Sequence, residues 1–293
     1  AGLLIYVAYL FLVRGNDTTM RWRGHLAKAR LRGSWSLAAV AVGGWLVMAG
    51  FGYYNTKVLN TYQTSDEAED EQVRYETTYK RYEHMVQPHY TDVEFNIDLD
   101  PENRVIAYTA DIVLLNKSNE AIDTLYLNVP HRMEVKLDIP NGELVLNDEK
   151  LDQRMYRLSP ALAAGSSIKV KVTGGWHAKG FENRTEFSGL VSNGSFFNNM
   201  ELIPTIGYST GGELQDRADR RKHKLPPNDR MPKLSADPAE RMQNYLMANS
   251  DWVNVRTTIS TSLDQIAIAP GSLKKEWQAD GKRYFRYELD HKA

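Results

Sequence analysis

The 293-residue sequence contains no cysteine. This excludes a disulfide-stabilised scaffold, a cysteine-ligated zinc site and a thiol nucleophile. The sequence also has no excess of one charge, because 36 Lys and Arg stand against 37 Asp and Glu, so we expect no nucleic-acid partner. A charged fraction of 25% and an apolar fraction of 42% are typical of a folded chain. The length allows one or two domains.

Several catalytic signatures are also missing. No H-E-x-x-H pattern is present, which would place two zinc ligands and a general base on one helix face. The P-loop and the G-x-G-x-x-G nucleotide motif are absent as well. We therefore predict no catalytic residues and no metal ligands within this chain.

One long uncharged run is present, at residues 34–54 (SWSLAAVAVGGWLVMAGFGYY). At ~1.5 Å per residue, a helix over this run is roughly 30 Å long, which matches the hydrocarbon thickness of a bilayer. Aromatic residues stand at both of its ends, as in spanning helices. The alternatives are a buried core helix and a signal sequence, whose apolar region is shorter.

The charges around this run predict its orientation. Residues 14–33 carry six Arg and Lys against one acid, whereas acidic residues cluster after residue 65. Short basic loops stay in the cytoplasm, so everything after residue 54 is expected on the extracytoplasmic (periplasmic) side of the inner or cell membrane. We thus predict a membrane segment in residues 1–54: the end of one spanning helix (1–13), a cytoplasmic loop (14–33) and a second spanning helix (34–54). A complete N-terminal anchor in residues 1–13 is the alternative.

The polar remainder divides at Pro88. Residues 55–88 contain no Gly and have apolar residues at helical spacing, which predicts a helical stalk with its helix at 65–86. The acidic run at the start of that helix suits the positive end of the helix dipole, and metal binding there is the alternative.

Residues 89–293 have the period of two that is typical of strands. Expected strands cover residues 90–99, 105–116, 125–129, 135–139, 143–146, 155–158, 168–173, 252–262, 265–269, 273–278 and 283–289. We predict a mainly β fold, an antiparallel β-sandwich or saddle domain behind a transmembrane helix and a helical stalk. Residues 216–233 are expected as a solvated charged loop, and a helix is expected from Asp237 to about Ala248.

The Gly- and aromatic-rich residues 174–208 indicate either a packed corner or a ligand cleft. The stretch YTDVEFNIDLDPENRVIAYTADIVLLNKSNEAIDTLYLNV (90–129), followed by YRLSPALAAGSSIKVKVTGGW (156–176), resembles the opening of the N-terminal domain of aminopeptidase-N-like zinc metallopeptidases. Residues 196–208 (FFNNMELIPTIGY) and 252–273 resemble the branch of that family that is fused behind an ABC-transporter-type permease.

This resemblance implies that the chain is part of a membrane-anchored zinc aminopeptidase. The chain would supply the membrane tether and a wall of the substrate cleft. Zinc is expected in a C-terminal catalytic domain beyond this chain, with no cofactor inside it. The partners implied are the lipid bilayer, that catalytic domain, the peptide substrate and transporter subunits.

Some motifs of that family are absent from this sequence. Its Pro-Cys pair is Pro204-Thr205 here, and its pocket glutamine has no clear counterpart. The nearby candidates for a substrate pocket are Asn193, Asn198, Asn199 and Glu201, which alternatively satisfy backbone groups of the loop. A non-enzymatic extracytoplasmic interaction module of a transporter complex, binding a protein, peptide or glycan, is the alternative function.

Overall fold

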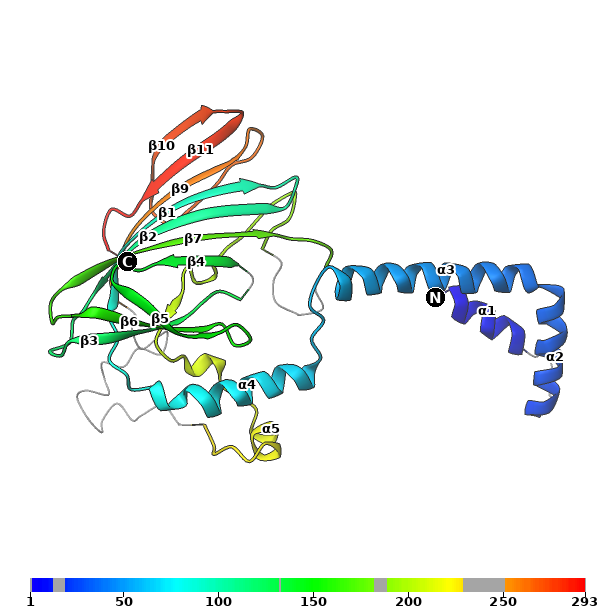
Figure 1. Cartoon of the computed structure of the whole chain (residues 1–293). Helices are drawn as coiled ribbons and strands as arrows, with labels where there is room; N and C mark the ends of the chain where they lie inside the picture. The colour runs from blue at the N-terminus through cyan, green and yellow to red at the C-terminus, as the bar shows by residue number, and fades with distance from the viewer. Residues whose placement is uncertain (1, 13–18, 132, 182–188, 229–250, 293) are drawn as a thin grey trace. The chain divides into compact units, whose positions relative to one another are not determined.

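A computed structural model describes residues 2–12, 19–131, 133–181, 189–228 and 251–292 (Figure 1). The chain divides into two compact units. The first, which we call the helical unit, comprises Ala1–Tyr62 and Lys179–Thr185. The second, which we call the β-unit, comprises Gln63–Ala178 and Glu186–Ala293.

The helical unit contains the predicted apolar helix. Helix α3 (Trp35–Tyr53) continues into a π-helical turn, η1 (Tyr54–Val58), and together they are long and apolar enough to cross a membrane. None of its most apolar 18-residue window is buried by the described part of the chain. A core helix of a soluble protein buries at least one face, so this exposure does not support the core-helix alternative.

Two further helices pack beside α3. Helix α1 (Gly2–Phe11) lies within residues 1–13, and α2 (Met20–Gly33) occupies most of the predicted cytoplasmic loop. Arg, Lys, Leu and Ala all have high helix propensity, which explains why this segment is helical and not irregular. A small apolar cluster joins the three helices, formed by Tyr6, Leu10, Ala27, Ala38 and Ala41.

The β-unit begins with α4 (Ser65–Tyr79), which starts at the predicted residue. Thr64 caps it: its hydroxyl accepts a hydrogen bond from the Glu67 backbone, and the Glu67 carboxylate accepts one from the Thr64 backbone. This reciprocal capping satisfies two backbone donors that a helix start leaves open. The helix ends earlier than residue 86, because a short 3-10 turn, η2 (Lys80–Tyr82), replaces the last α-helical turns.

Two sheets form the body of the β-unit (Figure 1), which confirms the predicted fold class. The seven-stranded sheet has the order β10 (Ser272–Ala279), β11 (Lys282–Glu288), β9 (Asn254–Ser262), β1 (His89–Asp100), β2 (Val105–Leu115), β7 (Ser167–His177) and β4 (Glu134–Asp138). The four-stranded sheet has the order β5 (Gly142–Asp148), β6 (Gln153–Leu162), β3 (Ile122–Asn128) and β8 (Thr205–Ile206).

The strands differ from the sequence prediction in two respects. β1 and β9 pair in parallel, so the larger sheet is mixed. A parallel pair needs a long connection, and more than 150 residues of chain separate these two strands. The strand predicted at residues 265–269 is wrong, because that segment has no strand pairing. The helix predicted from Asp237 lies outside the described residues.

Apolar side chains fill the space between the sheets. Alternate residues of β2, among them Ile106, Ala110 and Ile112, are at most 2% exposed, as expected for a strand with one face on the core. A second cluster lies where α4 covers the four-stranded sheet (Figure 1) and consists mainly of tyrosines: Tyr75, Tyr79, Tyr126 and Tyr208, with Met155. The predicted stalk helix is therefore integrated into the β-unit by its buried face.

Candidate functional site

A hollow of about 350 Å³ opens beside strands β1 and β9, and we call it the β1–β9 hollow. Val93 and Phe95 of β1 and Val255 of β9 contribute to its apolar lining. The segment that leads into β8 forms another wall with Asn199, and Thr205 of β8 continues it. Such a surface, apolar with few polar groups, is typical of a place where a side chain or an apolar protein surface is bound.

Tyr90 anchors the wall of the hollow. Its hydroxyl donates a hydrogen bond to the Pro204 carbonyl, which ties the segment before β8 to β1. Burial raises the pKa of the Tyr90 hydroxyl well above its usual value of 10.0. The phenol is therefore neutral near pH 7, and its role here is to position the wall rather than to transfer protons.

Asp251 provides the negative charge at the hollow. Its carboxylate pairs with the Lys117 ammonium and lies 3.6 Å from His89 Nδ1. The hydrogen bond from Lys117 lowers the pKa of Asp251 below its usual 3.8. Asp251 is thus ionised, and the Lys117 ammonium balances its negative charge. This pairing favours a structural role, in which Asp251 fixes the chain ahead of β9.

The four predicted pocket residues have different environments. Asn199 lines the hollow. Asn198 and Glu201 instead cap the 3-10 turn η3 (Asn199–Glu201): the Asn198 side chain accepts a hydrogen bond from Met200 N at 3.2 Å, and Glu201 accepts one from Asn198 N at 2.9 Å. Asn193 is exposed in a turn.

Of these four residues, Asn199 is therefore the one that the structure places at the candidate site. Asn198 and Glu201 have the backbone-satisfying role that the sequence offered as the alternative. The spacing Asn198-x-x-Glu201 is itself a capping signal that sequence reasoning had overlooked.

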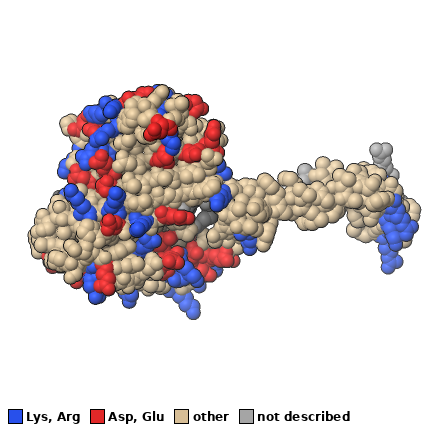
Figure 2. All heavy atoms as spheres, turned by 45° about the horizontal axis from the view of Figure 1, so that its top comes forward, with Lys and Arg blue, Asp and Glu red and all other residues tan. Residues whose placement is uncertain are grey.

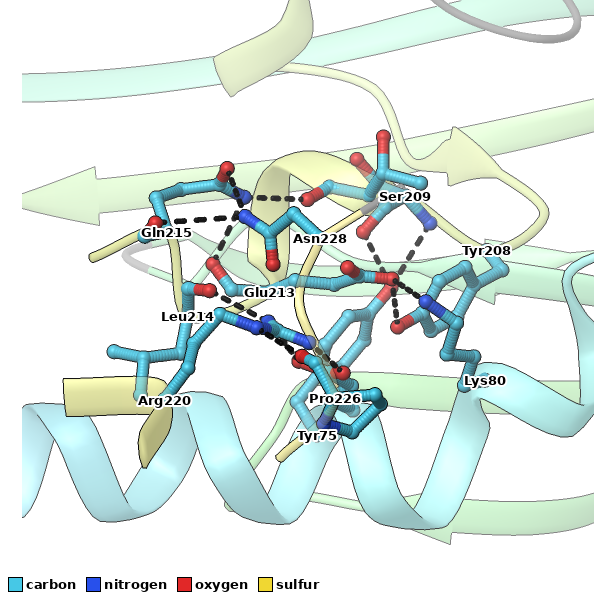
Figure 3. Close-up of polar contacts among 12 residues, drawn as sticks. Tyr75, Lys80, Tyr208, Ser209, Glu213, Leu214, Gln215, Arg220, Pro226 and Asn228 are labelled. Carbon is cyan, nitrogen blue, oxygen red and sulfur yellow. Dashed lines mark hydrogen bonds and ion pairs between the residues drawn. The ribbon is translucent and has the colours of Figure 1, made fainter. Parts of the chain in front are cut away.

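The charged loop predicted at residues 216–233 is not solvated throughout, which corrects that prediction. It contains a short helix, α5 (Arg217–Lys222), whose Arg220 is only 2% exposed. Arg220 forms a bidentate ion pair with Glu76 of α4. It also donates hydrogen bonds to the carbonyls of Leu214 and Pro226 (Figure 3). Four acceptor contacts satisfy the buried guanidinium, so burial is compatible with its charge.

A second buried carboxylate lies beside this pair. Glu213 accepts hydrogen bonds from the Tyr208 hydroxyl at 2.9 Å and from Lys80 Nζ at 3.1 Å (Figure 3). The Tyr75 hydroxyl donates to the Ser209 carbonyl and accepts from the Ser209 backbone amide. These contacts fasten α4 to the segment that follows β8.

The buried acidic and basic side chains of this arrangement are paired with one another. Among the described residues, no group of three His, Asp or Glu side chains could hold a metal ion. The buried carboxylates are already paired with cations. The described part of the β-unit thus offers an apolar hollow beside β1 and β9, with buried ion pairs elsewhere in the unit.

Sequence comparison with known proteins finds no relative: no protein-family profile and no curated protein matches the chain. Solved structures that resemble the fold include an M1 zinc metallopeptidase from Deinococcus radiodurans, at 12% identity and a TM-score of 0.40 over 70% of this chain and 40% of that one. Its mutant bound to a Tyr-Ser-Ala substrate gives 10% identity and a TM-score of 0.41 over the same shares.

Legionella pneumophila aminopeptidase A in complex with aspartic acid is also similar, at 13% identity and a TM-score of 0.38, over 71% of this chain and 20% of that one. The chain thus spans about two fifths or less of the length of these proteins. Similarity at this level does not assign the chain to a family or an activity.

Proposed function

We propose that this chain is the membrane-attached, non-catalytic N-terminal part of a zinc aminopeptidase of the aminopeptidase-N type. The supporting observation is the fold of the two segments, 90–129 and 156–176, whose sequences resemble that family. Residues 90–129 provide β1, β2 and β3, and residues 156–176 provide the end of β6 and nearly all of β7. β2 pairs along its whole length with β1 on one side and β7 on the other. The resembling segments thus supply three adjacent strands of the seven-stranded sheet, β1, β2 and β7, and two neighbouring strands of the four-stranded sheet, β3 and β6.

In this proposal the β1–β9 hollow is part of the substrate-cleft wall. Its apolar lining suits a peptide side chain or the surface of a zinc-bearing domain, and Asn199 adds an amide that can donate to and accept from a peptide backbone. The family's zinc does not fit this chain, since the described residues hold no ligand group for it. The metal and its ligands belong to the proposed catalytic domain elsewhere in the parent protein.

Attachment to the membrane is the second element of the proposal. Trp35–Val58 is the helix that would span the bilayer, and the basic α2 before it would remain in the cytoplasm. The β-unit would then be extracytoplasmic, and fusion to a permease-type membrane domain is the arrangement that the resemblance implies.

A labelling experiment tests this topology. Because the chain has no cysteine, single cysteines can be introduced at Lys28 in α2 and at exposed Ser192 in the β-unit. In intact cells, a membrane-impermeant maleimide is expected to label S192C and to leave K28C unlabelled until the cells are opened. Labelling of K28C alone, or extraction of the chain by alkaline carbonate, would contradict the proposal.

The role of the hollow is tested in the product of the complete gene. Val255→Trp fills the hollow from β9, and Val145→Trp places the same ring at an exposed position on β5. We expect V255W, but not V145W, to lower kcat/KM for aminoacyl substrates at least tenfold. A complete reading frame without H-E-x-x-H and a downstream Glu ligand would rule the proposal out directly.

An extracytoplasmic interaction module is the second candidate, and one observation favours it. The outer face of the seven-stranded sheet has a second hollow, of about 560 Å³, whose lining includes the short polar side chains of Asn96, Thr109 and Thr258. Amides and hydroxyls in register across three strands suit a hydroxyl-rich ligand such as a glycan. Saturable glycan binding by a full-length protein that lacks peptidase activity would favour the module.

A further inference from the structure

Helix α2 has a basic face with a regular spacing. Arg21, His25, Lys28 and Arg32 follow one another at intervals of four, three and four residues, which places them on one side of the helix. All four side chains are exposed, and α2 contains no acidic residue. Figure 2 shows the Lys and Arg atoms of this part of the chain gathered together, with no Asp or Glu atom of the described residues beside them.

The rotation of α2 is fixed by its contacts with α1. Ala27 is 7% exposed and lies in the cluster with Tyr6 and Leu10. Arg30, on the same side of α2, donates hydrogen bonds to the Tyr9 carbonyl at 2.8 Å and to the Leu10 carbonyl at 3.3 Å. The Arg30 guanidinium therefore balances the partial negative charge of the carbonyl groups at the C-terminal end of α1. The basic face is turned away from α1 and remains available to a partner.

A third face of α2 is apolar. Trp22, Leu26 and Ala29 lie at intervals of four and three residues, and Trp22 is 53% exposed. The helix breaks at Ser34, which has φ −131°, and α3 starts at Trp35. In Figure 1, α2 turns away from the axis of α3. A helix with adjacent apolar and basic faces, at the end of a spanning helix, has the properties of a helix that lies in the membrane interface.

We propose that the basic face of α2, formed by Arg21, His25, Lys28 and Arg32, binds the headgroups of anionic phospholipids in the leaflet next to it. This inference rests on the proposed membrane attachment. The apolar face would enter the acyl boundary through Trp22, and the phosphate groups would lie against the guanidinium and ammonium groups. Charge complementarity supports a phosphate-bearing partner, and the neighbouring apolar face supports a lipid rather than a nucleic acid.

The experiment uses the full chain in nanodiscs of neutral phosphatidylcholine, into which brominated phosphatidylglycerol or brominated phosphatidylcholine is titrated. Bromine quenches nearby tryptophan, and the difference between the wild type and Trp22→Phe isolates the signal of Trp22. We expect brominated phosphatidylglycerol to quench Trp22 at a much lower lipid fraction than brominated phosphatidylcholine does. Added salt should weaken the preference, because it screens exposed charges.

A triple variant with its matched control makes the test specific. Arg21→Gln, Lys28→Gln and Arg32→Gln together should weaken the affinity for phosphatidylglycerol by on the order of a hundredfold, since each cation near an anionic surface contributes roughly fivefold. Brominated phosphatidylglycerol should then quench Trp22 no better than brominated phosphatidylcholine does. The control removes three exposed lysines of the β-unit instead, by Lys150→Gln, Lys169→Gln and Lys171→Gln, and should leave the preference unchanged.

The outcomes are distinguishable. Equal quenching by the two lipids, or a preference that survives the triple change, would overturn the inference. Displacement of the lipid by a short RNA at physiological salt would identify the face as a nucleic-acid surface and would also overturn it. A chain that does not enter nanodiscs at all would instead contradict the proposed membrane attachment. Inorganic phosphate should not displace the lipid, because it lacks the acyl chains that Trp22 contacts.

Discussion

Arg220 and Glu76, 144 positions apart in the sequence, form a buried ion pair in the β-unit with N–O distances of 2.7 and 2.8 Å. Their side chains are 2% and 3% exposed. This pair joins α4 to α5 and holds the segment that follows β8 against α4. The helix ahead of the sheets is thus fastened at its buried face by a charge pair as well as by the tyrosine cluster.

Breaking this pair should destabilise the β-unit strongly. Arg220→Met leaves the Glu76 carboxylate buried without its cation, and we expect a loss of about 3–5 kcal/mol in the free energy of unfolding. The double variant Glu76→Met with Arg220→Met removes both charges and should recover most of that loss. Urea unfolding followed by near-ultraviolet circular dichroism measures both. A single variant that loses less than about 1 kcal/mol would show that the pair does not hold α4.

Gly174 should tolerate no side chain. A Cβ at this position would lie 2.3 Å from the ring of Tyr108, the residue opposite it on β2. Gly174→Ala is expected to cost about 1–3 kcal/mol through overpacking. Gly194→Ala is the control, since a Cβ there meets nothing within 4 Å. Thermal unfolding of the two variants compares them, and equal melting temperatures would contradict the geometry.

Thr64 should matter because it caps α4. Thr64→Ala removes the hydroxyl that accepts from the Glu67 backbone at 3.2 Å, and we expect a loss of about 1 kcal/mol. Thr64→Ser keeps the acceptor and should behave like the wild type. The free energy of unfolding in urea distinguishes the two, and a Ser variant as unstable as the Ala variant would remove capping as the explanation.

The ion pair between Asp251 and Lys117 should give a small acid-dependent stabilisation. Lys117 lowers the pKa of folded Asp251 below the usual 3.8, so the contribution is fully present above that value. It is lost as the pH falls through the lower pKa of the folded state. After solvent screening we expect about 0.5 kcal/mol. The wild type should exceed Asp251→Asn in unfolding free energy at about pH 6. This difference should vanish in strong acid, and a difference that grows with acidity would contradict the assignment.

Local patterns predicted the strands well where alternation is strict. The period of two in residues 90–99 places β1 within one residue of its observed ends, and the same holds for β2. β7 extends beyond the predicted residue 173 through Gly174, although glycine is unfavourable in strands. The reason is tertiary: the ring of Tyr108 takes up the space that a side chain would need at Gly174.

Long-range contacts explain what sequence patterns could not predict. The burial of Arg220 depends on Glu76, and no local periodicity relates the two positions. The parallel pairing of β1 with β9 likewise has no local signal. At the candidate site, the polar loop residues were proposed from their place in the segment that resembles the aminopeptidase family. Only the fold separates Asn199, which lines the hollow, from Asn198 and Glu201, which cap a turn. The apolar lining was not predicted, because it combines strands far apart in the sequence.

The most direct test of the central proposal is the zinc content and aminopeptidase turnover of two purified proteins, this chain and the product of its complete gene. We expect no stoichiometric zinc and no release of a fluorogenic aminoacyl group with this chain. The complete product should contain one zinc per molecule and should turn the substrate over. Zinc-dependent turnover by this chain itself, or a complete product with neither zinc nor turnover, would contradict the account.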